Sequence, residues 1–228
     1  DKAIRYCRMA FALENKPQKQ DLYNKFIELA QSNYDLLKSS SEKNNYPLEI
    51  DVRSIEISIS MLRKEYDLCI SQALLILNQQ PRPDEDLAME LMSSVATCYV
   101  LQKKYEDAKN AFKDMYRIIS DPEKFPQIQR KIIFETSKCE YELGNYERSV
   151  ELGELGVEMN RHYEDVYKYI ILSYIAMSKI EFSDSAVSIR AMKYATDTCQ
   201  RAIRYEVPWD IEHRLVLEAQ LKKLQHEN

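Results

Sequence analysis

Apolar side chains in residues 86–120 recur with the period of an α-helix, in two runs separated by a short polar stretch. Both runs follow the three- and four-residue spacing that gathers side chains on one face of a helix. The first run is Met92, Val95, Ala96 and Tyr99, and the second is Ala108, Phe112 and Met115. The segment therefore predicts two helices that fold back on each other near Tyr105. Such a hairpin cannot bury its own apolar face, so it needs neighbours.

The polar corner of this hairpin occurs three times in the chain. Each copy has a tyrosine followed three residues later by a small residue, and the copies align without gaps. Their tyrosines are Tyr66, Tyr105 and Tyr146, which lie about 40 residues apart. Two helices in each period of about 40 residues are typical of an α-solenoid. We therefore predict an all-α fold, an α-solenoid of about five antiparallel helix pairs with a C-terminal capping helix.

The same spacing predicts helices along the rest of the chain. They cover residues 1–14, 19–39, 50–62, 69–77, 127–143, 147–160 and 166–179, with a late helix around 195–202 and a last one from 208 to about 225. The apolar side of the helix over 19–39 is expected to carry Leu22, Phe26, Leu29 and Ala30, followed by Leu36 and Leu37. The polar residues 39–45 are predicted to form a linker. Residues 50–60 hold many β-branched side chains, which favour a strand, but their helical neighbours favour a helix.

These elements are expected to form a single repeat domain over residues 1–228. Residues 1–45 make a diverged first helix pair, residues 47–207 the regular pairs, and residues 208–226 a capping helix that covers the last pair. The capping helix also carries a second apolar stripe, formed by Leu217, Leu221 and Leu224. One packing face does not need two stripes, so we predict that the second stripe supports a homodimer.

The large, small and aromatic positions of this pattern resemble those of the tetratricopeptide repeat, in which two helices join at a tyrosine corner. The matching residues are Met92, Val95, Ala96, Tyr99, Tyr105, Ala108, Phe112 and Met115. The resemblance covers residues 47–207. It departs from the family in its period, which is near 40 rather than about 34 residues, and at Glu140, Gly153 and Gly156. It implies a solenoid scaffold that binds a protein or peptide, while the fold alone does not select the partner.

The composition narrows the class of partner. Charged residues make up 30% of the chain, and the net charge of −5 is spread along it without a basic stripe, which argues against a nucleic-acid surface. No run of about 18 apolar residues occurs, so no membrane span is predicted. The five cysteines are scattered and form no CxxC motif, so we expect reduced core residues of a cytoplasmic protein. They are Cys7, Cys69, Cys98, Cys139 and Cys199.

The chain offers little catalytic or metal-binding chemistry. The three histidines have no second ligand at helical spacing, so we predict no metal site; they are His162, His213 and His226. Gly153 and Gly156 lie inside an expected helix rather than in a phosphate-binding loop, and close approach of a neighbouring helix explains them better. We therefore predict no enzyme activity, no catalytic residues and no cofactor.

In a stacked array the inner face of each first helix lies one residue after its core stripe, and this face lines a channel. The predicted lining residues are Ser93, Thr97 and Val100; Phe134, Lys138 and Tyr141; and Lys168, Leu172 and Ile175, preceded by Ser54, Ser58 and Met61. Lys138 and Lys168 are its main positive charges, so the expected partner is a protein or peptide with apolar anchors and an acidic group. The alternative is that these side chains only pack neighbouring helices.

Two functions fit this pattern. The first is a protein- or peptide-binding scaffold module that uses the concave face of the superhelix. The alternative is a ligand-sensing regulatory domain, such as the peptide-binding half of a bacterial pheromone-responsive regulator, whose DNA-binding or effector part would precede Asp1. The chain begins in a helical pattern without a methionine, so we expect further sequence upstream.

Overall fold

The computed structural model describes residues 2–14, 16–44, 50–79, 83–121, 124–160, 164–180 and 185–205. These residues form ten α-helices and one short 3-10 helix, and they contain no strand. The predicted all-α class is therefore confirmed, and the β-branched residues 50–60 are helical. The chain divides into two compact units, residues 1–120 and residues 121–228, and each is described by itself.

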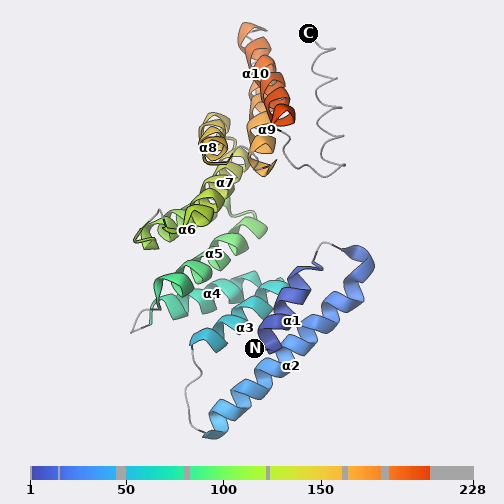
Figure 1. Cartoon of the computed structure of the whole chain (residues 1–228), viewed down its shortest axis with the longest axis vertical. Coiled ribbons are helices and arrows are strands. Elements are labelled where there is room, and N and C mark those ends of the chain that lie inside the picture. Colours follow the sequence, from blue (N-terminus) through green and yellow to red (C-terminus); the bar gives the residue numbers. More distant parts are fainter. Residues whose placement is uncertain are drawn as a thin grey trace. The chain divides into compact units, whose positions relative to one another are not determined.

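The described part of the first unit, called unit 1, contains six α-helices in sequence (Figure 1). Their bounds are α1 Lys2–Phe11, α2 Gln20–Asn44, α3 Ile50–Leu62, α4 Tyr66–Leu77, α5 Glu85–Leu101 and α6 Tyr105–Ile118, with the 3-10 helix η1 at Pro17–Lys19. Each α-helix packs against the next one along the chain, and in addition α1 packs on α3 and α3 on α5. The helices α1, α3 and α5 therefore lie next to one another in a row.

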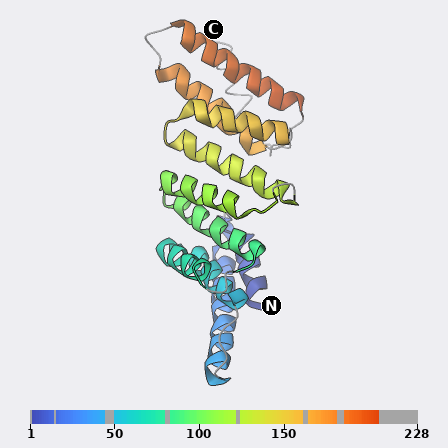
Figure 2. The same cartoon turned by 90° about the vertical axis from the view of Figure 1, so that its left-hand side faces the viewer.

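The second unit, called unit 2, follows the same order in its described residues (Figure 2). Its helices are α7 Pro126–Glu142, α8 Tyr146–Met159, α9 Glu164–Ile180 and α10 Ser185–Arg204. Each helix packs on the next, and α7 also packs on α9. All four helices contribute to one cluster of buried side chains, in which Tyr167 is the largest fully buried residue.

The three tyrosine corners share one backbone conformation. Each first helix is followed by a residue with a positive φ angle, 63° at Lys64, 60° at Lys103 and 82° at Gly144. The amide of the next residue donates to the carbonyl oxygen five residues back, at 2.9 Å in all three corners. The amide of the positive-φ residue itself donates to the carbonyl oxygen three residues back. This pair of bonds is the Schellman motif, which satisfies carbonyl groups at the end of a helix.

Lys103→Gly is expected to raise the free energy of unfolding by about 1 kcal/mol, because glycine adopts a positive φ angle without steric cost. Lys113→Gly is the matched control: Lys113 is exposed inside α6, where glycine is expected to lower stability by about 1 kcal/mol. Urea denaturation followed by circular dichroism measures both effects. Effects of the same sign at the two positions would contradict the conformational explanation.

The predicted linker at residues 39–45 is wrong, because α2 continues to Asn44. Serine is only a moderate helix former, but its hydroxyl can bond back to its own helix. Ser39 does so, since its Oγ donates to the carbonyl oxygen of Asp35 at 2.7 Å. A polar composition therefore marks a solvated helix here rather than a break between two helices.

The apolar side of α2 also differs from the prediction. Ala30 is buried as predicted, but three of the four expected leucines, Leu22, Leu36 and Leu37, are exposed. Instead, Tyr23 and Tyr34 are buried, each with a hydrogen bond to α3. The Tyr23 hydroxyl donates to the carbonyl oxygen of Leu62 at 2.6 Å, and the Tyr34 hydroxyl donates to Glu56 Oε2 at 2.7 Å. A bonded hydroxyl permits the ring to be buried, which periodicity alone does not reveal.

α8 and α9 approach each other closely at the two glycines of α8. A Cβ atom at Gly153 would lie 2.4 Å from Cγ1 of Ile170, and one at Gly156 would lie 3.2 Å from both γ carbons of Val166. Both Ile170 and Val166 are fully buried between the helices of unit 2. The close helix approach predicted from the sequence is confirmed.

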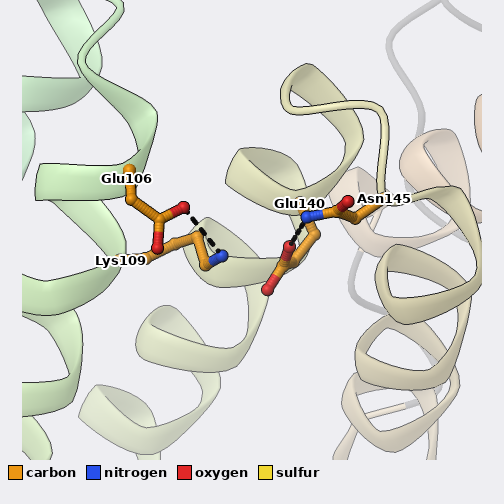
Figure 3. A network of polar contacts seen from close by, with 4 residues as sticks. All are labelled: Glu106, Lys109, Glu140 and Asn145. Carbon is orange, nitrogen blue, oxygen red and sulfur yellow. Dashed lines mark hydrogen bonds and ion pairs between the residues drawn. The ribbon is translucent and has the colours of Figure 1, made fainter.

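Glu140, which replaces an aromatic residue of the tetratricopeptide pattern, stabilises the third corner. It is only 7% exposed, and its Oε2 accepts a hydrogen bond from Asn145 Nδ2 at 2.8 Å (Figure 3). A buried carboxylate needs such a donor, because an unpaired one would be costly. Figure 3 also shows the ion pair of exposed Glu106 and half-buried Lys109 on α6, whose charged atoms lie 3.1 Å apart.

Some predictions fall outside the described residues. They are the capping helix over 208–226 with its second stripe, and the three histidines. The late helix expected around 195–202 is part of α10. The single domain over residues 1–228 stays a prediction.

Candidate binding groove

A cavity of about 580 Å³ lies between α1, α3 and α5 of unit 1. We call it the unit 1 groove. Each of the three helices presents a stripe of side chains to it. These include Ile4, Arg8 and Phe11 on α1, Ser54 and Ser58 on α3, and Asp86, Leu87 and Glu90 on α5. On α1 and α3 the members recur at intervals of three or four residues, and on α5 Asp86 and Leu87 lie four and three residues before Glu90, which places each set on one face.

The unit 1 groove includes two residues predicted to line the channel, Ser54 and Ser58. On α5 its wall consists of residues that precede the predicted triplet. From Asp86 and Glu90 the same spacing continues through that triplet, which is Ser93, Thr97 and Val100. All three of these side chains are half-buried. The cavity therefore lies against the N-terminal half of α5, and the predicted residues extend its wall.

Two hydroxyl groups on these faces, those of Ser58 and Thr97, are bonded within their own helices. Ser58 Oγ donates to the carbonyl oxygen of Ser54 at 3.1 Å, and Thr97 Oγ1 donates to that of Ser93 at 2.8 Å. Their hydrogen-bonding needs are met by the backbone. This part of the surface is thus small and weakly polar, and it leaves room for a bulky group.

Apolar side chains form the α1 side of the unit 1 groove. Ile4 is 37% exposed and Phe11 is 38% exposed, although both face the cavity. Leu87 on α5 is half-buried. Exposed aliphatic and aromatic side chains beside a hollow are a common mark of an interaction site.

Charge in the unit 1 groove is mostly negative. Asp84, Asp86 and Glu90 bring carboxylates to the lining, and Arg8 brings the opposite charge. Asp84 Oδ1 accepts a hydrogen bond from the amide of Leu87 at 2.9 Å and so caps α5. Among the described residues, neither Asp86 nor Glu90 forms an ion pair. Within the described part of unit 1, two carboxylates of the groove therefore lack an ion-pair partner.

In unit 2 the predicted channel residues lie where α7 and α9 meet. Phe134 is 8% exposed and belongs to the buried cluster. The ring centre of Tyr169 lies 5.9 Å from that of Phe134 and 5.6 Å from that of Tyr141, in tilted contacts that stabilise aromatic pairs. Leu172 and Ile175 are partly buried against the same cluster. These side chains thus pack the helices together, and only their outer parts are open to a partner.

The two predicted lysines have partners inside unit 2. Lys138 Nζ lies 3.8 Å from Glu135 Oε2, one turn earlier on α7. Lys168 Nζ lies 5.7 Å from the ring centre of Tyr169. Contacts of this kind contribute about 0–1 kcal/mol each near a surface, so both ammonium groups can exchange them for a stronger acidic partner.

The α1 side of the unit 1 groove and its acidic residues were not predicted from the sequence. A signal for both was present. The alternation of four and three residues runs back from Ser93 through Glu90 to Asp86, and it recurs on α1 at Ile4, Arg8 and Phe11. α1 packs on α3. This tertiary contact could not be predicted, because the sequence of the first helix pair has diverged from the repeat pattern.

The five cysteines are free and buried, as predicted. Burial raises the pKa of Cys7 to about 11 and that of Cys199 to about 12. Cys69 of α4 and Cys98 of α5 are hydrogen-bonded, and this bond together with burial raises the pKa of Cys69. A buried thiol with a raised pKa is a poor nucleophile, so these three groups are not candidates for covalent catalysis.

Among the residues that the structure describes, no group of three or more histidine, cysteine, aspartate and glutamate side chains could hold a metal ion. None of the helices in that part of the chain is both long and apolar enough to cross a membrane. A comparison with models of known protein families finds no match, and a search of curated proteins finds none either. The tetratricopeptide resemblance therefore stays a prediction from the sequence.

Proposed function

We propose that this chain is a protein- or peptide-binding scaffold module that holds a segment of its partner in the unit 1 groove. The observation that carries this proposal is the convergence of stripes from α1, α3 and α5 on one cavity. The exposed Ile4 and Phe11 supply apolar contacts for the bound segment. Grooves between helices with apolar anchor sites are a recurring way to bind peptides.

The architecture that we propose is an α-solenoid of tetratricopeptide type. It is supported by the packing order within each unit, where helices contact their neighbours along the chain and first helices contact the next first helix. It is also supported by the three corners with the same hydrogen bonds. In this proposal residues 208–226 cap the last pair, and their second stripe forms a homodimer.

The partner proposed for the faces of α7 and α9 is a protein or peptide with apolar anchors and an acidic group that meets Lys138 and Lys168. It is neither a nucleic acid nor a membrane, and the module acts in the cytoplasm without catalysing a reaction. Both lysines lie on half-buried parts of the surface, where a charge-assisted contact is less screened than in open solvent.

Ser58→Trp tests the proposed function, because the indole occupies part of the unit 1 groove. We expect it to weaken the binding of peptides selected from an array by the wild-type chain at least about tenfold, or about 1.4 kcal/mol. Ser32→Trp, on the exposed surface of α2, is the matched control and should leave binding unchanged. If binding survives Ser58→Trp while the circular dichroism spectrum and melting temperature are unchanged, the groove is not the binding site.

Lys138→Glu/Lys168→Glu tests the acidic group of the partner. We expect peptides with apolar anchors and an acidic residue to bind this variant about tenfold more weakly, because attraction becomes repulsion. Leu172→Asp should weaken the binding of the same peptides, because it removes an apolar contact. Lys179→Glu, at an exposed position of α9, is the control for charge. Fluorescence anisotropy measures the affinities, and unchanged binding in folded variants would remove these residues from the site.

A ligand-sensing regulatory domain is the second candidate. It is favoured by the volume of the unit 1 groove, which falls in the range of about 300–1,000 Å³ typical of small-ligand sites. A ligand that binds only the folded chain raises its melting temperature. A thermal-shift screen that finds small molecules but no peptides would favour the sensor, and so would a helix-turn-helix directly upstream.

A further inference from the structure

We propose that the unit 1 groove receives a lysine or arginine side chain of the bound peptide, with its charged end at Glu90 and Asp86. The aliphatic part of that side chain lies against Ile4 and Phe11. This inference rests on the proposed function and names the chemistry of the segment that unit 1 binds. It concerns a different segment of the partner from the acidic group proposed for α7 and α9.

The carboxylate of Glu90 is the group in the unit 1 groove that most favours a positively charged partner. Asp84 caps α5, and Asp86 lies in its first turn, where the helix dipole stabilises negative charge. Glu90 lies beyond that turn and four residues after Asp86, a spacing at which like charges repel. Within the described residues it has no ion-pair partner. A positive charge brought by the partner would relieve this repulsion.

The remaining lining fits a long basic side chain better than a bare cation. Lysine and arginine combine a charged end with an apolar stem, and Ile4 and Phe11 offer exposed apolar surface for that stem. The hydroxyl of Ser58 is bonded to its own helix, so it is occupied as a donor. In the described residues the carboxylates of this lining form no group suited to a metal ion.

Arg8 limits how basic the bound segment can be. Arg8 lines the same cavity from α1, whereas the acidic residues come from the N-terminal half of α5 and its cap. A run of consecutive lysines would place some of them beside Arg8, where like charges repel. The groove therefore selects one or two basic side chains flanked by apolar residues, rather than a polybasic segment.

The test uses the full chain and three fluorescent peptides of alanine and leucine that differ only at two central positions, which are lysine, glutamine or glutamate. We expect the lysine peptide to bind about tenfold more tightly than the glutamine peptide, and the glutamate peptide to bind most weakly. Glu90→Gln should reduce the affinity for the lysine peptide about threefold, and Asp86→Asn/Glu90→Gln about tenfold. The preference should shrink at high salt, because salt screens exposed charges.

Glu42→Gln is the matched control, since Glu42 lies on α2 outside the groove lining and should change none of these affinities. Glu90→Gln should melt no earlier than the wild-type chain, because it removes a like-charge pair. Asp86→Asn also removes a charge that stabilises the helix N-terminus, so the double variant is compared at a temperature at which circular dichroism shows that it is folded. A loss of binding in these variants is therefore not explained by unfolding. Weakened lysine-peptide binding with an unchanged melting temperature supports the proposal.

The outcomes distinguish this inference from the proposed function. One outcome is that Ser58→Trp abolishes binding while Glu90→Gln and Asp86→Asn/Glu90→Gln leave the preference for the lysine peptide intact. In that case the groove binds peptides, but the proposal that it receives a basic side chain at these carboxylates is wrong. If the lysine peptide binds Ser58→Trp as well as the wild type, both proposals fail. Equal binding of the lysine and glutamate peptides, or no measurable binding of any peptide, also overturns the inference. Displacement of the lysine peptide by an equal concentration of free spermidine would assign the carboxylates to a small polyamine instead.

Discussion

Phe112→Ala is expected to lower the free energy of unfolding of unit 1 by about 3–5 kcal/mol. The side chain is 1% exposed and is among the largest fully buried side chains described. Truncation removes its apolar contacts and leaves a cavity that the close-packed helices around α6 fill only partly. Urea denaturation measures the loss, and amide hydrogen exchange shows whether it falls on the amides of unit 1.

Tyr116→Ala is the matched control for this prediction. Tyr116 lies one turn further along α6 and is 50% exposed, so its truncation should change stability by no more than about 0.5 kcal/mol. The two substitutions shorten aromatic side chains on the same helix and differ in burial. Similar losses at Phe112 and Tyr116 would contradict the assignment of Phe112 to the core.

Gly153→Ala is expected to destabilise unit 2 by about 2 kcal/mol, although alanine is the better helix former by about 1 kcal/mol. The added Cβ would lie 2.4 Å from Cγ1 of Ile170, which is fully buried. α8 and α9 must therefore move apart, and overpacking of this kind costs about 1–3 kcal/mol or more. Thermal denaturation followed by circular dichroism measures the net effect.

Gly156→Ala is the matched control on the same helix. Its Cβ would lie 3.2 Å from Val166, a tighter contact than usual but one that a small adjustment relieves, so we expect a change of about 0.5 kcal/mol or less. Ile170→Ala removes the clashing atom but leaves a cavity of its own, so the double variant should lose less stability than the sum of the two single variants. Additive losses in the double variant would show that the clash with Ile170 is not the cause.

The sequence was sufficient to predict those parts of the fold that depend on local pattern. The corners at Tyr66, Tyr105 and Tyr146 each begin a helix, and Phe112 is buried as its spacing indicates. The α2 helix shows where local pattern fails. Its length was underestimated because polar residues were equated with a linker, and its buried face was misassigned because hydrogen-bonded tyrosines replace leucines.

The candidate site was predicted less completely, because it depends on which helices pack together. Ser54 and Ser58 followed from the spacing on α3, whereas the contribution of α1 follows only from its contact with α3. In unit 2 the ring of Tyr169, one residue after Lys168, lies against Phe134 and Tyr141. Neighbouring residues on a helix can differ in role, one lining the channel and the next packing against another helix. At aromatic positions the periodicity of the sequence does not show which of the two residues has which role.

The packing of each helix on its neighbours along the chain also bears on how the protein folds. In both units the main contacts join helices that are adjacent or next but one in sequence. Such local contacts require only short loops to close, and folding rates rise as the sequence separation of contacts falls. A hairpin such as α5–α6 or α9–α10 can form first and receive the next helix. The chain is therefore suited to fold hairpin by hairpin as it leaves the ribosome, before its synthesis is complete.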